Sequence, residues 1–281
     1  MCFMSNSRLC AVLLATASVL CASAPALAKG QVPKPDHVVL VMEENHSYSE
    51  VIGNGAAKYI NTLAQNGALF TQSFAVEHPS QPNYLDLFSG TNQGVNGDAC
   101  PNDYGNIANE ESELIKKGLS FRGYSEGLPE KGSLVCTQGE YARKHVPWTN
   151  FTNDPGKFSL PFTKFSKNYD KLPTVSWIIP NLEDDMHDGT VEQGDTWLQD
   201  NIASYVSWVN THNSLLIVTW DEDDGTENNQ IATLFIGPMV KAGQYSEHIN
   251  HYNVLRTIEA MYGLKPIANE KSVQPITDVW Q

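Results

Sequence analysis

An apolar run late in the chain ends abruptly in four acidic side chains. The stretch SLLIVTWDEDDG, residues 214–225, reads as a buried strand followed by Asp221, Glu222, Asp223 and Asp224. Carboxylates this close together repel one another unless water or a cation offsets their charge. Asp223 and Asp224 precede a glycine and are typical of a turn. Asp221 and Glu222 are therefore the acids in this stretch that we consider for metal chemistry.

Two other apolar runs end in polar clusters in the same way. HVVLVM, residues 37–42, leads into Glu43-Glu44-Asn45-His46, and TVSWIIP, residues 174–180, leads into a segment with Asn181, Glu183, Asp184, Asp185, His187 and Asp188. In open α/β sheets, ligand sites lie outside the carboxyl ends of the strands. Any one of these acids alone is typical of a helix cap or a solvated turn. Three clusters at the same strand end instead predict one shared rim, where one or two divalent cations (Zn, Mn, Mg or Ca) offset the charge.

Ser80 is the candidate nucleophile. It lies in EHPSQPNYLDLFSG, just ahead of an expected helix, where backbone N–H groups and the helix dipole favour an anion such as phosphate. A metal ion in contact with the Ser80 hydroxyl would lower its pKa and activate it for attack. The alternative is that Ser80 only caps the helix. The sequence has no G-x-S-x-G motif, which disfavours an esterase of the Ser-His-Asp type.

The elements that must position these residues alternate along the chain. The spacing of apolar residues and the local composition predict strands at 37–42, 68–76, 174–180, 214–220 and 230–237. They predict helices at 56–67, 81–90, 195–212 and 251–263. This alternation predicts an α/β fold with a mostly parallel central sheet and helices on both faces. Residues 92–170 are rich in Gly, Asn, Asp and Pro, and we expect a loop-rich insertion or cap there.

The beginning of the chain has the pattern of a secretory signal. Arg8 precedes an apolar run that ends at Ala26-Leu27-Ala28, a small-x-small cleavage site. We therefore expect a signal peptide over residues 1–28 and a single domain over residues 29–281. The apolar run is too short for a membrane span, and no later stretch approaches one. The expected product is secreted or periplasmic, without integral membrane association.

The net charge limits the classes of binding partner, and the cysteine content predicts a disulfide. The formal net charge is −14, and loss of Arg8 with the signal would make it −15. Such an acidic surface disfavours nucleic acid as a partner, and it admits an anionic substrate only where a local positive centre reverses the sign. Cys100 and Cys136 are the cysteines left after signal removal. An oxidising compartment favours a disulfide between them over two separate thiols.

Six blocks in order along the chain resemble a known family. They are VMEENHSY, HPSQPNYLDLFSGT, YARKHVPW, DDMHDG with GDTWL, TWDED and HYNVLRTIEAMYGL, and they span about residues 36 to 265. Together they resemble the bacterial phosphoesterase family of secreted acid phosphatases and phospholipases C, in the alkaline phosphatase superfamily. The resemblance implies an alkaline-phosphatase-like fold and a metal-dependent hydrolase of phosphate esters.

The resemblance also implies residue roles. Ser80 matches the attacking hydroxyl that bridges to metal, and the other implied metal ligands are Glu44, Asp185, His187, Asp221, Glu222 and His251. The implied substrate contacts are Asn45, Asn83 and His145, with Asn83 also a candidate support for the loop. His187 or His251 would protonate the leaving alcohol, and His248 is the alternative to His251.

The expected function is hydrolysis of phosphomonoesters, with phosphoinositides among the candidate substrates, through a phosphoserine at Ser80. The expected partner is accordingly a small phosphate ester or a phospholipid headgroup. The first alternative is a phospholipase C acting on phosphodiesters. A second alternative is a secreted binding protein that uses the metal-supported rim, with loop aromatics such as Tyr104, Trp148 and Phe151, without turnover.

Overall fold

The computed structural model describes residues 1–2, 30–153 and 156–281. The predicted signal peptide therefore lies almost entirely outside the described residues. Within the described part of the chain, no helix is both long enough and apolar enough to cross a membrane.

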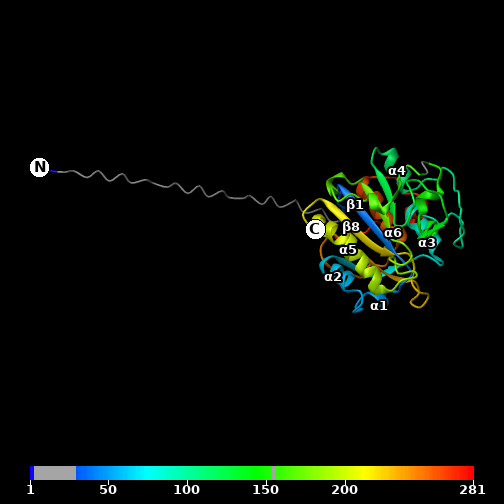
Figure 1. Cartoon of the computed structure of the whole chain (residues 1–281), viewed down its shortest axis with the longest axis horizontal. Helices are drawn as coiled ribbons and strands as arrows, with labels where there is room; N and C mark the ends of the chain where they lie inside the picture. The colour runs from blue at the N-terminus through cyan, green and yellow to red at the C-terminus, as the bar shows by residue number, and fades with distance from the viewer. Residues whose placement is uncertain (3–29, 154–155) are drawn as a thin grey trace.

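A nine-stranded sheet runs through the centre of the molecule (Figure 1). The strand order is β10-β2-β9-β8-β1-β7-β3-β6, and β11 pairs with β2. Strand β9 is antiparallel to its neighbours β8 and β2, and the other pairs are parallel, which confirms the mostly parallel sheet. The strands are β1 His37–Glu43, β2 Ala68–Phe74, β3 Phe121–Ser125, β6 Ser159–Pro161, β7 Val175–Ile179, β8 Ser214–Trp220, β9 Gln230–Ile236, β10 Gly243–Tyr245 and β11 Ile249–Asn250. A separate pair is formed by β4 Thr137–Gln138 and β5 Tyr141–Ala142.

Helices cover both faces of this sheet. The α-helices are α1 Tyr48–Val51, α2 Lys58–Asn66, α3 Ser80–Ser89, α4 Glu110–Lys116, α5 Val191–Val209 and α6 His251–Tyr262. The 3-10 turns are η1 Arg143–His145, η2 Pro147–Asn150, η3 Phe162–Lys164, η4 Tyr169–Lys171 and η5 Ala268–Ser272. Alternate side chains of β1 point to opposite faces: Val38 and Leu40 join the apolar cluster of α3 and α6, and Val39 and Val41 join that of α2 and α5.

The predicted elements are present, with small changes at their ends. The helix expected at 195–212 begins four residues earlier, because the Thr190 side chain accepts a hydrogen bond from the Gln193 N–H and caps it. The segment 92–170 contains helix α4 and strands β3 and β6, which the sequence did not predict. Both strands extend the main sheet beyond β7, so this segment shares the sheet.

A disulfide joins Cys100 to Cys136, with a Cα–Cα distance of 5.8 Å, as predicted. It ties two parts of the 92–170 segment together across 36 positions of sequence.

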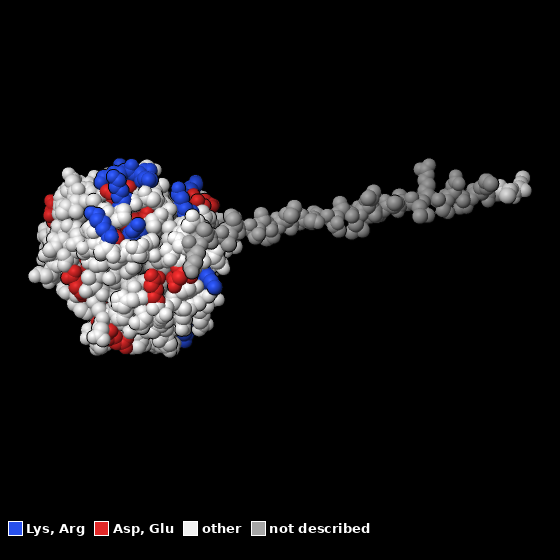
Figure 2. Space-filling view, turned by 180° about the vertical axis from the view of Figure 1, so that it is seen from behind, with Lys and Arg blue, Asp and Glu red and all other residues white. Residues whose placement is uncertain are grey.

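The surface does not carry its negative charge evenly. Figure 2 shows a face on which lysines and arginines gather over one end while acidic residues lie scattered below. The net charge of −14 is therefore a poor guide to the local potential on this face.

Candidate active site

The backbone joins the three predicted polar clusters at one edge of the sheet. Strand β1 lies between β7 and β8 in parallel register, so the chain segments that follow these strands leave the sheet side by side. The Asp221 N–H donates to the Glu43 carbonyl at 3.0 Å, and the Glu44 N–H donates to the Asp185 carbonyl at 2.8 Å. The carboxylates of Glu44, Asp185 and Asp221 are consequently held near one another.

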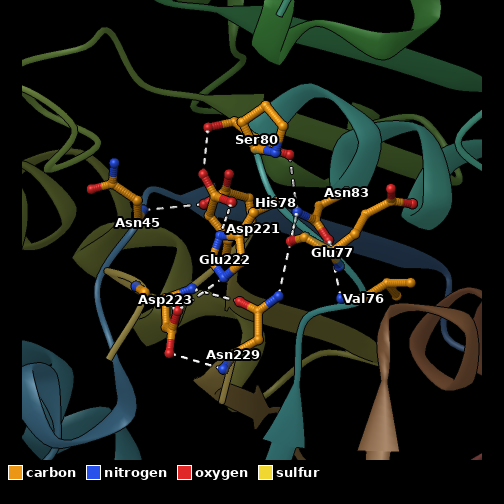
Figure 3. Close-up of polar contacts among 12 residues, drawn as sticks. Asn45, Val76, Glu77, His78, Ser80, Asn83, Asp221, Glu222, Asp223 and Asn229 are labelled. Atoms are coloured by element: carbon orange, nitrogen blue, oxygen red, sulfur yellow. Dashed lines mark hydrogen bonds and ion pairs between the residues drawn. The ribbon is translucent and has the colours of Figure 1, made fainter. Parts of the chain in front are cut away.

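Ser80 is the first residue of α3 and faces two acids of the rim, Glu44 and Glu222. Its Oγ lies 3.0 Å from Glu44 Oε2 and 3.0 Å from Glu222 Oε1. Figure 3 shows Ser80 beside Glu222, Asp221 and His78. A serine hydroxyl has a single proton, so it can donate to one of these oxygens at a time. At the second contact, a lone pair of the serine oxygen faces a lone pair of the carboxylate oxygen, and the two repel each other. A bound cation or an additional proton would remove this repulsion.

His145 lies between two buried carboxylates. Its Nε2 is 3.0 Å from Glu44 Oε1 and its Nδ1 is 3.3 Å from Asp185 Oδ2, while its ring stacks on Tyr84. Burial alone would lower the pKa of His145, but the charges and hydrogen bonds of Glu44 and Asp185 together outweigh it and raise the pKa to about 9. Burial would likewise raise the pKa of Glu44, but the positive charge of His145, together with hydrogen bonds from His145, Tyr84 and Asp221, brings it to about 2. The pair is therefore held in its charged form.

The other acids of the rim resist ionisation in the metal-free protein. Burial, followed by repulsion from Glu44 and Glu222, raises the pKa of Asp221 well above its usual range. Burial and the charge of Glu44 also raise the pKa of Glu222. Such crowding of carboxylates is the arrangement that a divalent cation stabilises.

The donor set fits divalent cations. Asp221 Oδ2, a buried carboxylate oxygen at the rim, has no hydrogen-bond partner among the described residues, and Glu44 Oε1 and Asp185 Oδ2 face only the imidazole of His145. Two groups of ligand atoms each lie within 4.8 Å of one another: Glu44 with His145 and His187, and Glu44 with Asp221 and Glu222. Because Glu44 belongs to both groups, it is the residue that two neighbouring ions would share.

His187 reaches the rim from the loop after β7. Its Nδ1 lies 2.8 Å from Asp188 Oδ1, and its backbone N–H donates to Asp185 Oδ1 at 2.8 Å. Its Nε2 lies 3.2 Å from Lys144 Nζ. About a quarter of the His187 side chain is exposed, so this imidazole is accessible from solvent.

His251 is placed differently from the other predicted ligands. It begins helix α6, is buried, and its Nε2 lies 2.7 Å from the backbone carbonyl of Asp221. Burial lowers its pKa to about 4, so the neutral imidazole donates this hydrogen bond. His251 adjoins Asp221 but lies outside both groups of ligand atoms. His248, the alternative, stacks on Phe74.

The two asparagines predicted to contact substrate have different surroundings. The Asn45 backbone N–H donates to Asp221 Oδ1 at 3.1 Å, and Figure 3 shows its side chain pointing away from the carboxylates. Asn83 Oδ1 accepts from the N–H groups of Val76 and Glu77, and its Nδ2 donates to the Glu77 carbonyl. These are the contacts of a residue that braces the loop ahead of Ser80.

Three residues near the site are absent from the predicted set. His78, which the sequence offers either as a ligand or as a turn residue, lies between Glu222 and Asp223. Lys144 contacts His187 and Asp98, and Asp98 also accepts from the Gln81 N–H. The position of Lys144 directly before His145 was a usable signal, whereas nothing in the sequence around Asp98 indicates that its loop folds back onto α3.

The fold is shared with a solved protein from Vibrio parahaemolyticus described as a member of the alkaline phosphatase superfamily. The two structures superpose with a TM-score of 0.62 at 12% identity, over 88% of this chain and 72% of the other. The chain belongs to the Phosphoesterase family, whose sequence model matches residues 54–265.

Two curated relatives are informative. The chain is 52% identical over 256 residues to a phosphatidylinositol-3-phosphatase of Mycobacterium tuberculosis, covering 90% of this chain and 86% of the relative. It is 28% identical to an acid phosphatase of Aspergillus fumigatus, covering 79% of this chain but only 53% of the fungal protein. The chain thus spans about half the length of the fungal relative and most of the mycobacterial one.

Proposed function

We propose that this phosphoric monoester hydrolase attacks phosphorus with the hydroxyl of Ser80 and passes through a phosphoserine. The observation that carries the proposal is the contact of Ser80 Oγ with Glu44 and Glu222, each at 3.0 Å, at the N-terminus of α3. The 52% identity to a phosphatidylinositol-3-phosphatase over most of both chains supports the reaction class.

Glu222 is the better acceptor for the proton of Ser80. Its Oε1 lies 3.0 Å from Ser80 Oγ, whereas Glu44, the other acid at this distance, is already paired with His145. As the Ser80 oxygen bonds to phosphorus, its proton moves to Glu222 Oε1, and the ester P–O bond breaks. Water then attacks the phosphoserine and gives a proton to His187, the P–O bond to Ser80 breaks and phosphate leaves, and Ser80 regains its proton from Glu222.

The leaving oxygen needs a proton, and we assign its delivery to His187. Of the two histidines predicted for this role, His251 is buried with its Nε2 bonded to a carbonyl, while His187 is partly exposed at the rim. An accessible imidazole is suited to general acid catalysis.

Divalent cations complete the proposed site. Glu44, Asp221 and Glu222 would hold one, and Ser80 contacts this group. Glu44, His145 and His187 would hold a second ion, and the acid role of His187 belongs to the form of the site in which this second group is empty. When bound, such ions supply positive charge that lowers the pKa of a serine hydroxyl and stabilises the anionic transition state. Asp185 supports this arrangement through His145 and the His187 backbone, and His251 supports it through the Asp221 backbone.

We infer a phosphate monoester as substrate and secretion as the destination. The name of the mycobacterial relative makes a 3-phosphorylated phosphoinositide the first natural substrate to test. The inferred secretion depends on the predicted signal at residues 1–28.

Substitution Ser80→Ala tests the nucleophile. We expect hydrolysis of p-nitrophenyl phosphate to fall by about a thousandfold or more, with divalent metal still bound by elemental analysis. Ser89→Ala, at the other end of α3, is the matched control and should keep its activity. Retained turnover in Ser80→Ala would end this assignment.

The choice of substrate separates the alternatives. Preference for p-nitrophenylphosphorylcholine over p-nitrophenyl phosphate would indicate a phospholipase C. Absence of turnover on any phosphate ester, with metal bound, would indicate the binding protein.

A further inference from the structure

A lysine and an aspartate contact each other beside the proposed nucleophile. Lys144 Nζ lies 3.2 Å from Asp98 Oδ2 and 3.2 Å from His187 Nε2. Asp98 Oδ1 accepts a hydrogen bond of 3.0 Å from the N–H of Gln81, the residue that follows Ser80. The Asp98 carboxylate thus bridges a backbone N–H next to the nucleophile and the ammonium group of Lys144.

This bridge occupies donors that suit a phosphoryl group. A carboxylate spanning a helix N-terminal N–H and an ammonium uses two oxygens, and a phosphate monoester presents oxygens with more negative charge. About a fifth of the Lys144 side chain and a third of the Asp98 side chain are exposed. Because both lie at the surface, they can separate without disturbing the buried core.

The surrounding charges explain why a cation is needed here. The proposed site is built from the carboxylates of Glu44, Asp185, Asp221 and Glu222, which repel a dianionic substrate until cations offset them. Lys144 adds a permanent positive charge on the solvent side of this cluster, next to the exposed imidazole of His187.

We propose that Lys144 is a specificity-determining residue that binds a phosphoryl oxygen of the substrate, and that Asp98 is the internal anion that the substrate displaces from it. The inference rests on the proposed function and adds a source of preference for monoesters. A dianionic monoester competes with Asp98 for the ammonium group more strongly than a monoanionic diester does, because it carries twice the charge. As the ammonium group turns to the substrate, it releases the Nε2 of His187.

Opposite effects of two substitutions test the displacement. Lys144→Gln should raise the dissociation constant of inorganic phosphate about tenfold, because it removes the cation, whereas Asp98→Asn should lower it severalfold, because it removes the competing charge. Phosphate binding is measured by calorimetry on metal-loaded protein that also carries Ser80→Ala, so turnover does not enter the readout. In the double variant Asp98→Asn/Lys144→Gln, the tighter phosphate binding caused by Asp98→Asn should disappear.

Substrate preference gives a second, independent measurement. With Ser80 present, Lys144→Gln should lower kcat/KM for p-nitrophenyl phosphate at least tenfold and for bis(p-nitrophenyl) phosphate less than threefold, and Lys144→Arg should recover part of the loss. Lys164→Gln, at an exposed lysine of η3, is the control for a change in overall charge.

The results separate this inference from the proposed function. Equal losses on both esters, an unchanged phosphate dissociation constant in Lys144→Gln, or weaker phosphate binding in Asp98→Asn would overturn the role of the pair. Loss of turnover in Ser80→Ala would still support the proposed function in each of those cases. If Ser80→Ala alone kept its activity, the proposed function would fail instead.

Discussion

At the scale of single residues, His145 determines the charge balance of the rim. It is the positive partner of both Glu44 and Asp185, and all three side chains are buried. Removing one member of a buried charged pair leaves its partner uncompensated, at a cost of about 3 kcal/mol or more. We therefore expect His145→Asn to lower the free energy of unfolding of the metal-free protein by about that amount, measured by urea denaturation at pH 7.

Divalent cations should reverse part of this loss, because a bound ion can offset the charge of Glu44 in place of the imidazolium. His212→Asn, at an exposed histidine, is the control and should leave stability nearly unchanged. A His145→Asn protein as stable as the unsubstituted one without metal would show that Glu44 and Asp185 are not held as ions by His145.

At the scale of elements, helix α3 carries Ser80 at one end and a glycine stop at the other. Gly90 caps the helix with φ of +71°, and a Cβ built on it would lie 2.1 Å from Glu270 Oε1. Gly90→Ala should therefore destabilise the protein by the cost of a positive φ, about 1 kcal/mol, and by a further cost for displacing the Glu270 carboxylate.

Gly94 is the matched control, since it has φ of +79° and a Cβ built on it would have no atom within 4 Å. Gly94→Ala reports the backbone cost alone, so the difference between the two thermal midpoints measures the contact with Glu270. Equal shifts for the two substitutions would contradict a tight contact at this helix end.

At the scale of the whole molecule, buried acids favour stability at low pH. Glu270 is fully buried, and its carboxylate oxygens have no hydrogen-bond partner among the described residues. Burial raises the pKa of Glu270 to about 8, and the negative charges of Glu259 and Asp86 add to this shift, while the positive charge of Arg256 opposes it. Between pH 4.5 and 8 the unfolded chain loses this proton while the folded protein keeps it, so stability falls as pH rises, and the full penalty is present above pH 8.

Glu270→Gln removes the titrating group and keeps its size. We expect its thermal midpoint to match that of the unsubstituted protein near pH 4.5 and to exceed it by about 3 °C or more at pH 8. A constant difference between the two proteins across this range would show that the Glu270 carboxyl does not titrate with folding.

The disulfide acts on the same scale, because it closes a long loop of the chain. Cys100 and Cys136 are 36 positions apart, and a loop of this length corresponds to about 3–4 kcal/mol of lost chain entropy in the unfolded state. The Cys100→Ser/Cys136→Ser double substitution should lower the free energy of unfolding by about 3 kcal/mol. Reductant should lower the midpoint of the unsubstituted protein and leave that of the double variant unchanged; equal responses would argue against this contribution.

The sequence determined much of the site because parallel strands impose a simple rule. Each acidic cluster followed a buried apolar run, and strands that lie parallel in neighbouring positions place their following residues at one edge. This rule, with the ordered blocks of the family, predicted that Glu44, Ser80 and Asp221 meet. The sequence analysis did not predict strands β3 and β6. They have only five and three residues, and they lie in a segment rich in turn-forming residues, so no apolar alternation is long enough to be recognised.

Only the tertiary structure decided which side chains face one another across the rim. The placement of His145 between Glu44 and Asp185, and the contact of Asp98 with Gln81 and Lys144, join segments tens of residues apart. The spacing of apolar residues and the local composition carry information over only a few residues. That information is enough to specify strands, helices and the chemical nature of the rim. The pairing of particular charges depends instead on how loops from different strands pack together, which nothing within each segment specifies.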